Sequence, residues 1–174
     1  MIWNSRMASA ISNTSPLLYL YRIQALHMLP HLFDSVMTPP AVVDELDEGR
    51  RKGFDVPNPV DYPWLEIRQP AALPSEWLAL DLGAGELATM TLALEMPGHI
   101  VLLDDMLARR TAHAAGLTVW VTLRILLEMK ARGLITRIEP LVDQLSDAGL
   151  WMTADIRQRI LALAGEHPSP ADSR

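Results

Sequence analysis

Five side chains carry oxygen atoms that could bind a cation. Each lies just after a predicted strand or within the first part of a predicted helix. They are Asn13, Glu45, Glu86, Asp104 and Asp105. Asp104 and Asp105 come directly after the fully apolar stretch 100–103, and Asn13 comes after the apolar run 8–12. Carboxylates that are held together repel each other and raise one another's pKa unless a cation lies among them. Because Mg²⁺ and Mn²⁺ prefer oxygen ligands, this set of side chains predicts a divalent metal site.

Alternating strand and helix signals would bring these residues to one edge of a sheet. The expected strands are 8–12, 35–38, 64–68, 100–103 and 117–121, and the expected helices between and after them begin near Pro16, Pro40, Gly85, Met106 and Leu123. This order predicts an α/β fold with a central parallel sheet and helices on both of its faces. Two additional helices are expected at 138–148 and 155–164. In such sheets, ligands bind beyond the carboxyl ends of the strands.

Capping residues and glycines indicate where some of these helices begin. Ser15 is expected to be the N-cap of the first helix, with Pro16 at its first position, and Thr153 is expected to cap the last helix. The segment 83–86 lacks the lysine of a phosphate-binding loop, so we expect a tight turn there.

The length of the chain predicts a single domain. With 174 residues, it is long enough to bury a core without disulfides or structural metals. We expect the domain to cover residues 8–165, with a lead-in over 1–7 and a polar, disordered tail over 166–174.

The composition excludes several classes of protein. The chain has no cysteine, which excludes a disulfide scaffold, a thiolate zinc site and a cysteine nucleophile. No stretch reaches the roughly 20 apolar residues of a membrane span, and no signal-peptide pattern is seen, so we expect a cytoplasmic protein. The net charge of −6 argues against binding of nucleic acid by bulk charge. A local cluster of metal-binding carboxylates would contribute to the same negative total.

Each candidate residue also has a structural explanation. Glu86 could be an acid that faces the positive end of a helix dipole, and Glu45 could belong to a solvated acidic run. Asp104 could cap the next helix and leave Asp105 free, or the reverse. Asn13 could be a turn residue. The residues alone leave these alternatives open.

Five segments, taken in order, carry a resemblance to a known family. They are 12–17 (SNTSPL), 39–46 (PPAVVDEL), 83–86 (GAGE), 102–110 (LLDDMLARR) and 126–135 (LLEMKARGLI). Together they resemble the PIN-domain superfamily, and more narrowly its prokaryotic PIN-like branch near the VapC-type toxins. The resemblance extends over about residues 8–163.

The resemblance implies a three-layer α/β/α sandwich and hydrolysis of RNA phosphodiester bonds with Mg²⁺ or Mn²⁺. By position, the family's acids fall on Asn13, Glu45, Glu86 and Asp105, with Asp104 beside the last of them. All five would then be metal ligands, and Glu45, Glu86 and Asp105 would be the catalytic residues. No further acid follows the last strand, where the chain has Thr122.

Three further residues are candidates for binding the substrate. Ser15 occupies the position of a small hydroxyl residue in the family. Arg109 and Arg110 could bind phosphates of the substrate, or they could be ordinary surface charge.

One position departs from the pattern of the family. Asn13 stands where the family usually has aspartate. An amide can donate a neutral oxygen to Mg²⁺, but it removes one negative charge from the site and cannot act as a base.

Two functional hypotheses follow. The first is a divalent-metal-dependent ribonuclease, with the toxin of a toxin-antitoxin pair as one expectation, an antitoxin protein as a partner and a homodimer as its state. The alternative, motivated by Asn13, is a catalytically weakened PIN-fold module that binds RNA or a protein partner. A metal-dependent phosphatase or nuclease on another α/β scaffold is a third hypothesis.

Overall fold

The computed structural model describes residues 8–73, 76 and 80–166, and these form two compact units. The first unit extends to Thr122 and the second begins at Leu123. The expected lead-in over 1–7 and most of the expected tail, 167–174, lie outside the described residues.

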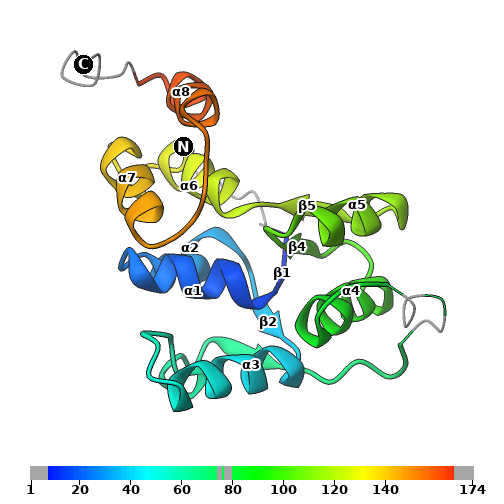
Figure 1. Cartoon of the computed structure of the whole chain (residues 1–174). Coiled ribbons are helices and arrows are strands. Elements are labelled where there is room, and N and C mark those ends of the chain that lie inside the picture. The colour runs from blue at the N-terminus through cyan, green and yellow to red at the C-terminus, as the bar shows by residue number, and fades with distance from the viewer. Residues whose placement is uncertain (1–7, 74–75, 77–79, 167–174) are drawn as a thin grey trace. The chain divides into compact units, whose positions relative to one another are not determined.

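A five-stranded parallel sheet forms the centre of the first unit. Its strands are β1 (Ala10–Ser12), β2 (Val36–Thr38), β3 (Leu65–Ile67), β4 (Ile100–Leu102) and β5 (Thr118–Trp120). Their order in the sheet is β3-β2-β1-β4-β5 (Figure 1). From β1, the next two strands are added on one side and the last two on the other, so the strand order reverses at β1. Ligands bind at such a switch point in open α/β sheets.

The strands are in register, and their carboxyl ends therefore meet at one edge. Ser12 is paired with Leu102, and Leu102 is paired with Trp120. On the other side of β1, Thr38 Oγ1 donates a hydrogen bond of 2.8 Å to the carbonyl oxygen of Ser12. The residues that follow β1 and β4 consequently lie side by side.

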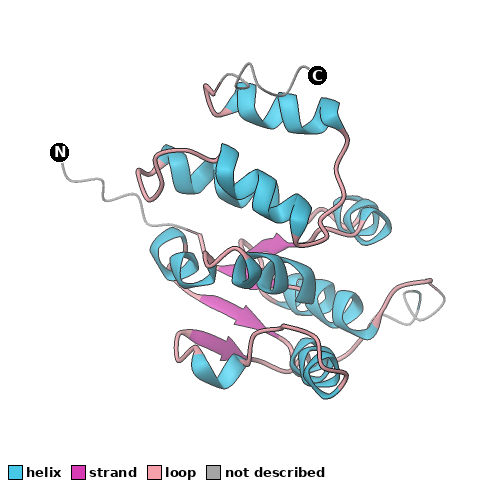
Figure 2. Ribbon diagram, turned by 60° about the vertical axis from the view of Figure 1, so that its left-hand side comes forward, coloured by secondary structure: helices cyan, strands magenta, loops and turns pink. Residues whose placement is uncertain are grey.

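Helices cover both faces of this sheet, as expected. They are α1 (Thr14–Arg22), α2 (Leu29–Leu32), α3 (Pro40–Arg51), α4 (Ala84–Glu95) and α5 (Met106–Ala114), with short 3-10 turns at Leu26–Met28 and Pro59–Asp61. In Figures 1 and 2, α1 and α2 lie on one side of the strands, and α4 and α5 lie on the other. Ile11 and Val101 of the central strands are buried against Met90 and Leu92 of α4 and Ala108 of α5. The predicted α/β sandwich with a parallel sheet is confirmed.

Two predicted details at helix starts are wrong. The N-cap of α1 is Asn13 and not Ser15, because the helix already begins at Thr14. The segment 83–86 is not an isolated tight turn, because Gly83 is the N-cap of α4 and the next three residues form the first helical turn.

Three helices follow the sheet, and all of their residues except Thr122 belong to the second unit. They are α6 (Thr122–Ala131), α7 (Glu139–Asp147) and α8 (Ala154–Leu163). As predicted, Thr153 caps α8, and its hydroxyl accepts a hydrogen bond of 3.1 Å from the backbone N–H of Ile156.

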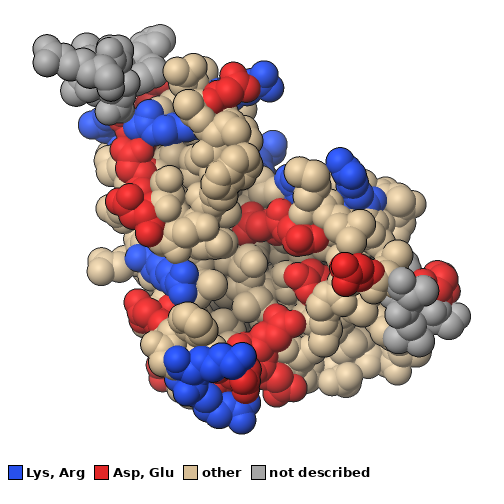
Figure 3. Space-filling model, in the orientation of Figure 1, with Lys and Arg blue, Asp and Glu red and all other residues tan. Residues whose placement is uncertain are grey.

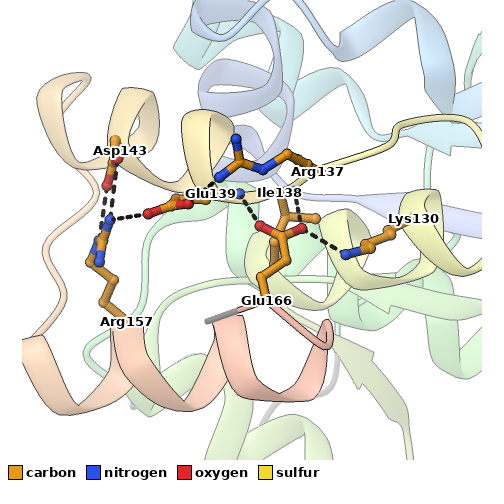
Figure 4. A network of polar contacts seen from close by, with 7 residues as sticks. All are labelled: Lys130, Arg137, Ile138, Glu139, Asp143, Arg157 and Glu166. Carbon is orange, nitrogen blue, oxygen red and sulfur yellow. Dashed lines mark hydrogen bonds and ion pairs between the residues drawn. The ribbon is translucent and has the colours of Figure 1, made fainter. Parts of the chain in front are cut away.

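A buried polar network connects the ends of these helices (Figure 4). Glu166 accepts hydrogen bonds from Lys130 Nζ at 2.8 Å and from the backbone N–H groups of Ile138 and Glu139 at 2.6 and 3.0 Å. Glu139 is paired in turn with Arg137 and with Arg157, which also binds Asp143. The prediction that the disordered tail starts at Glu166 is wrong for this residue, because its carboxylate is a buried part of the network.

Within the described part of the chain, no helix combines the length and the apolar character that crossing a bilayer requires.

Candidate active site

Asn13 lies at the carboxyl edge of the sheet, between β1 and α1. Its backbone N–H donates a hydrogen bond of 3.0 Å to the carbonyl oxygen of Leu102, which fixes it beside the end of β4. The residue is 1% exposed, and its Oδ1 atom has no hydrogen-bond partner among the described residues. A buried acceptor without a partner costs about 1–3 kcal/mol. This oxygen is therefore available to a ligand that enters the edge of the sheet.

Glu45 of α3 joins three helices at the same edge. One carboxylate oxygen, Oε2, accepts a hydrogen bond from the hydroxyl of Thr14 in α1. The other, Oε1, accepts a hydrogen bond of 2.8 Å from the backbone N–H of Gly85 in the first turn of α4. These two donors fix the orientation of the carboxylate, and both oxygens keep a free lone pair.

The glycines before Glu86 make room for the carboxylates. A Cβ atom at Gly85 would lie 2.5 and 2.7 Å from the two oxygens of Glu45, which is closer than real contacts allow. A Cβ atom at Gly83 would collide with the Glu86 carboxylate, and Glu45 Oε1 is also only 3.7 Å from that position. Both carboxylates therefore occupy the space over the start of α4.

The environment of Glu86 disfavours its charged form. Burial raises the pKa of this carboxyl group, and the nearby carboxylates of Glu45 and Asp105 raise it further. Hydrogen bonds from its own backbone and from the Asn13 side chain act in the opposite direction. Since an amide donates only through its nitrogen, the bond to Glu86 leaves Asn13 Oδ1 free.

Asp105 and Asp104 have different hydrogen-bond partners. Asp105 is the N-cap of α5, and its Oδ1 accepts a hydrogen bond of 2.8 Å from the backbone N–H of Ala108. Its other oxygen remains available on the exposed side of the edge. Asp104 is directed to Thr122, which donates to both of its oxygens. Burial raises the pKa of Asp104, while the hydrogen bonds from Thr122 and the charge of Arg109 lower it.

An open groove runs beside these residues between α3 and α4. Its volume is about 440 Å³, and it is lined by Ala41, Asp44, Glu45, Glu48, Arg51 and Ala84. Figure 3 shows acidic side chains on the face that carries α3 and α4, with Lys and Arg side chains near the C-terminal end of α3. These cations are neutralised by Asp47 and Glu48 within the helix. Three acidic side chains and one basic side chain therefore line the groove.

Comparison with known families decides what this architecture belongs to. A family model of the PIN domain, DUF3368, matches residues 9–166, which is most of the chain. The chain belongs to the PIN-domain family. No curated protein and no solved structure matches it significantly. The predicted superfamily is thereby confirmed, and the chain has the nuclease-type fold of PIN domains.

PIN domains generally use divalent metal ions. Across residues 8–73, 76 and 80–166, no three Asp, Glu or His side chains come close enough together to hold one ion. Glu45, Asp104 and Asp105 each accept a hydrogen bond from a donor of the protein itself. The unpartnered Oδ1 of Asn13 is a further oxygen donor at this edge. The donor set, all oxygen and mostly anionic, suits Mg²⁺ or Mn²⁺.

The three predicted substrate-binding residues of the PIN domain lie near this edge but have different surroundings. Ser15 is half-buried in the first turn of α1. Arg109 is partly buried in α5, and its Nε atom is buried without a hydrogen-bond partner in the described part of the chain. Arg110 is exposed on the same helix.

Sequence analysis missed three residues that shape the edge. Thr14 and Gly85 position the Glu45 carboxylate, and Thr122 binds Asp104. The spacing of glycines in 83–86 was a usable signal for Gly85, because a glycine one residue before a functional acid often allows close approach of another group. Nothing local marks Thr14 or Thr122, whose partners lie 31 and 18 residues away.

Proposed function

We propose that this PIN-domain protein is a divalent-metal-dependent endoribonuclease that hydrolyses RNA phosphodiester bonds. The observation that carries the proposal is the buried, unpartnered Oδ1 of Asn13 beside Glu86, at an edge where the nearby acids raise the pKa of Glu86. An orphaned oxygen among mutually repelling carboxylates is the arrangement that a bound cation would stabilise. RNA as the substrate rests on the resemblance of the sequence motifs.

The candidate ligands are Asn13, Glu45, Glu86 and Asp105. Because no three carboxylates of the described residues lie close enough together to hold one ion, a bound ion would have to draw these side chains together. A bound Mg²⁺ or Mn²⁺ supplies positive charge that offsets the negative charge developing on the phosphate and favours the ionisation of a water molecule. Asp104 is the least suitable ligand of the predicted set, because Thr122 engages both of its oxygens.

The side chains of the protein have separate tasks in this mechanism. Glu45 is held in one orientation by Thr14 and Gly85, so it presents fixed oxygens to the site. Glu86 has a raised pKa, which makes it a better proton acceptor than an ordinary glutamate. We assign to Glu86 the orientation and deprotonation of the attacking water.

Arg109 and Arg110 follow Asp105 by about one turn of α5 and would bind phosphates of the substrate. The buried Nε of Arg109 needs an acceptor, and the exposed guanidinium of Arg110 forms no ion pair within the described residues. Guanidinium groups bind phosphate oxygens through two parallel hydrogen bonds. An antitoxin partner, a homodimer and a cytoplasmic location remain proposals that follow from the same resemblance.

A second candidate function is favoured by Asn13 itself. Because an amide lacks a negative charge, the site holds one charge fewer than a full set of four carboxylates. A PIN module that binds RNA or a protein partner without cleaving it would have this composition.

RNA cleavage separates the two candidates. Purified protein is incubated with single-stranded and structured RNA in Mn²⁺, and with EDTA as the metal-free control. The proposal predicts cleavage by the native chain, and a loss of at least roughly a hundredfold in Glu86→Gln and in Asp105→Asn. Glu66→Gln is the matched control, because Glu66 is an exposed acid paired with Arg68 on the edge strand β3.

Asn13→Asp completes this experiment. If only Asn13→Asp cleaves RNA and the native chain does not, the binding module is the correct reading. If cleavage survives in a Glu86→Gln and Asp105→Asn double variant, the assigned site is wrong.

A further inference from the structure

Asp104 has a set of contacts that the proposed ligands do not share. Its Oδ1 accepts a hydrogen bond of 2.8 Å from the backbone N–H of Thr122, and its Oδ2 accepts one of 2.7 Å from the Thr122 hydroxyl. Thr122 is fully buried. Both carboxylate oxygens thus bind one residue, and Asp104 is not among the residues that line the groove beside Glu45.

These two bonds connect the carboxyl ends of neighbouring strands. Asp104 follows β4 and Thr122 follows β5, and the backbone N–H of Leu103 also donates a hydrogen bond of 3.0 Å to the carbonyl oxygen of Trp120. Three hydrogen bonds therefore fix the backbone that leaves β4. Without these three bonds, only the pairing of β4 with β5 in the sheet would hold the two strand ends together.

The residue that this backbone carries next is Asp105. Its Oδ1 is held by the N–H of Ala108 at the start of α5. The two consecutive carboxylates thus have different surroundings. Asp104 binds the buried Thr122, whereas Asp105 is exposed. A shift of the backbone at Asp104 would move Asp105 by the same amount.

We infer that Asp104, acting through Thr122, is a positioning residue that fixes Asp105 at the site and is not a ligand of the metal. The inference rests on the proposed function for the role of Asp105, and on the described contacts for the clamp itself. Groups that orient metal ligands through hydrogen bonds typically change metal affinity or activity by about 10–100-fold when they are mutated.

Matched variants at the two ends of the clamp test the inference. Asp104→Asn replaces the charged acceptor of the Thr122 hydroxyl with a neutral amide, Thr122→Val removes the hydroxyl donor, and Thr122→Ser retains the bond. We expect kcat for RNA to fall by about tenfold in both Asp104→Asn and Thr122→Val, with KM little changed, and to remain near the native value in Thr122→Ser. The double variant should lose no more than either single variant, because both remove one shared interaction.

A second measurement does not depend on catalysis. Hydrogen exchange of the Ala108 amide reports the bond to Asp105 Oδ1. Exchange of this amide should accelerate in Asp104→Asn and in Thr122→Val and stay native in Thr122→Ser. Circular dichroism confirms that each variant is folded.

The outcomes separate failure of the inference from failure of the proposed function. If Asp104→Asn abolishes Mn²⁺ binding or cleavage while Thr122→Val behaves like the native chain, Asp104 is a ligand and the inference is wrong. If neither variant changes exchange at Ala108, the clamp does not position Asp105. If the native chain cleaves no RNA but the exchange results hold, the proposed function fails and the positioning role stands.

Discussion

Glu86 illustrates at the residue scale how a functional site and a stable fold have opposite requirements. Burial and two neighbouring carboxylates raise the pKa of Glu86, so its ionised form is less favourable in the folded chain than in the unfolded one. A group of this kind stabilises the fold when it is protonated, and that stabilisation is lost as the pH rises through the raised pKa. At neutral pH, the charge on Glu86 therefore destabilises the metal-free protein.

A stability measurement checks this consequence. Glu86→Gln should raise the free energy of unfolding of the metal-free protein at pH 7, by about 1 kcal/mol or less because the side chain is only half-buried. The gain should disappear below the pH range in which a glutamate titrates. Urea unfolding of both proteins in EDTA at pH 7 and pH 4 provides the comparison. A lower stability of the variant at pH 7 would contradict the described electrostatics.

Gly85 gives a second prediction at this scale. Gly85→Ala would place a methyl group 2.5 Å from the nearer Glu45 oxygen, so the carboxylate must leave its position over the start of α4. We expect RNA cleavage to fall by roughly a hundredfold or more while the fold is retained, since displacement of a reacting group by about 1 Å has effects of that size.

Gly49→Ala is the control for this glycine. Gly49 lies in helix α3, and a Cβ atom there would lie at an ordinary 3.4 Å from the Val56 side chain. The change should leave cleavage intact and stabilise the helix by about 0.5–1 kcal/mol. Equal activities of the two glycine variants would show that the Glu45 position is not needed.

At the scale of elements, the start of helix α7 is capped by a carboxylate that lies outside the helices of the second unit. Glu166 follows α8 and binds the first two amide groups of α7, where Ile138 provides no side-chain cap in the described chain. Burial alone would raise the pKa of Glu166, but hydrogen bonds from Lys130, Ile138 and Glu139 together lower it. The bonds of Glu166 therefore stabilise the folded state above the pH at which an unfolded glutamate titrates, and this contribution is lost as the pH falls through its lowered pKa.

Glu166→Gln tests the role of this cap. The variant should lower the free energy of unfolding at pH 7 by about 1–3 kcal/mol, because buried charge-assisted hydrogen bonds are weakened. The difference from the native chain should shrink below pH 4.5. Arg159→Gln, which removes only an exposed pair with Asp155, is the control and should change stability little. A native-like Glu166→Gln variant at pH 7 would contradict the role of the network in Figure 4.

Elements were easier to predict from the sequence than the contacts between them. An apolar run marks the central strand at 100–103, shorter apolar segments mark the other strands, and prolines and glycines mark most helix ends, since their effects are local. The start of α1 was placed two residues late, because Pro16 is tolerated within a first turn and not only at its first position. The clamp between Asp104 and Thr122 and the cap by Glu166 depend on pairs that are distant in sequence, so no local pattern shows them.

The candidate site was predicted in part for the same reason. Residue type selected all three of Asn13, Asp105 and Glu86, the first two by their position after a strand and Glu86 by its position at the start of a helix. The structure brings them to one edge. The orientation of each carboxylate follows from its hydrogen-bond donors, and these are contributed by other elements. Sequence patterns therefore located the edge but could not show that Asp104 turns away from it.

At the scale of the whole molecule, the charge distribution would determine how the proposed RNA substrate binds. The net charge is −6, and the cations at the end of α3 are paired with acids of the same helix. Arg109 and Arg110 are the cations that we assign to the substrate. Binding by so few contacts releases few counterions, and affinity should therefore depend weakly on salt.

Fluorescence anisotropy of labelled single-stranded RNA at increasing NaCl measures this dependence. With about two phosphate contacts, the slope of log affinity against log salt should be near −1.4, and Arg110→Ala should reduce it by about 0.7. Arg132→Ala, an exposed arginine after α6, is the control and should leave the slope unchanged. A slope several times steeper would show that a larger basic surface binds the RNA.

The central claim is that Asn13 and the neighbouring carboxylates form a divalent metal site, and Mn²⁺ titration followed by electron paramagnetic resonance tests it most directly. The account predicts binding by the native chain, a loss of affinity of at least about tenfold in Glu86→Gln and in Asn13→Ala, and tighter binding in Asn13→Asp. Glu66→Gln should bind like the native chain. Equal Mn²⁺ affinity in the native chain, Glu86→Gln and Asn13→Ala, or no binding by any of them, would contradict the account.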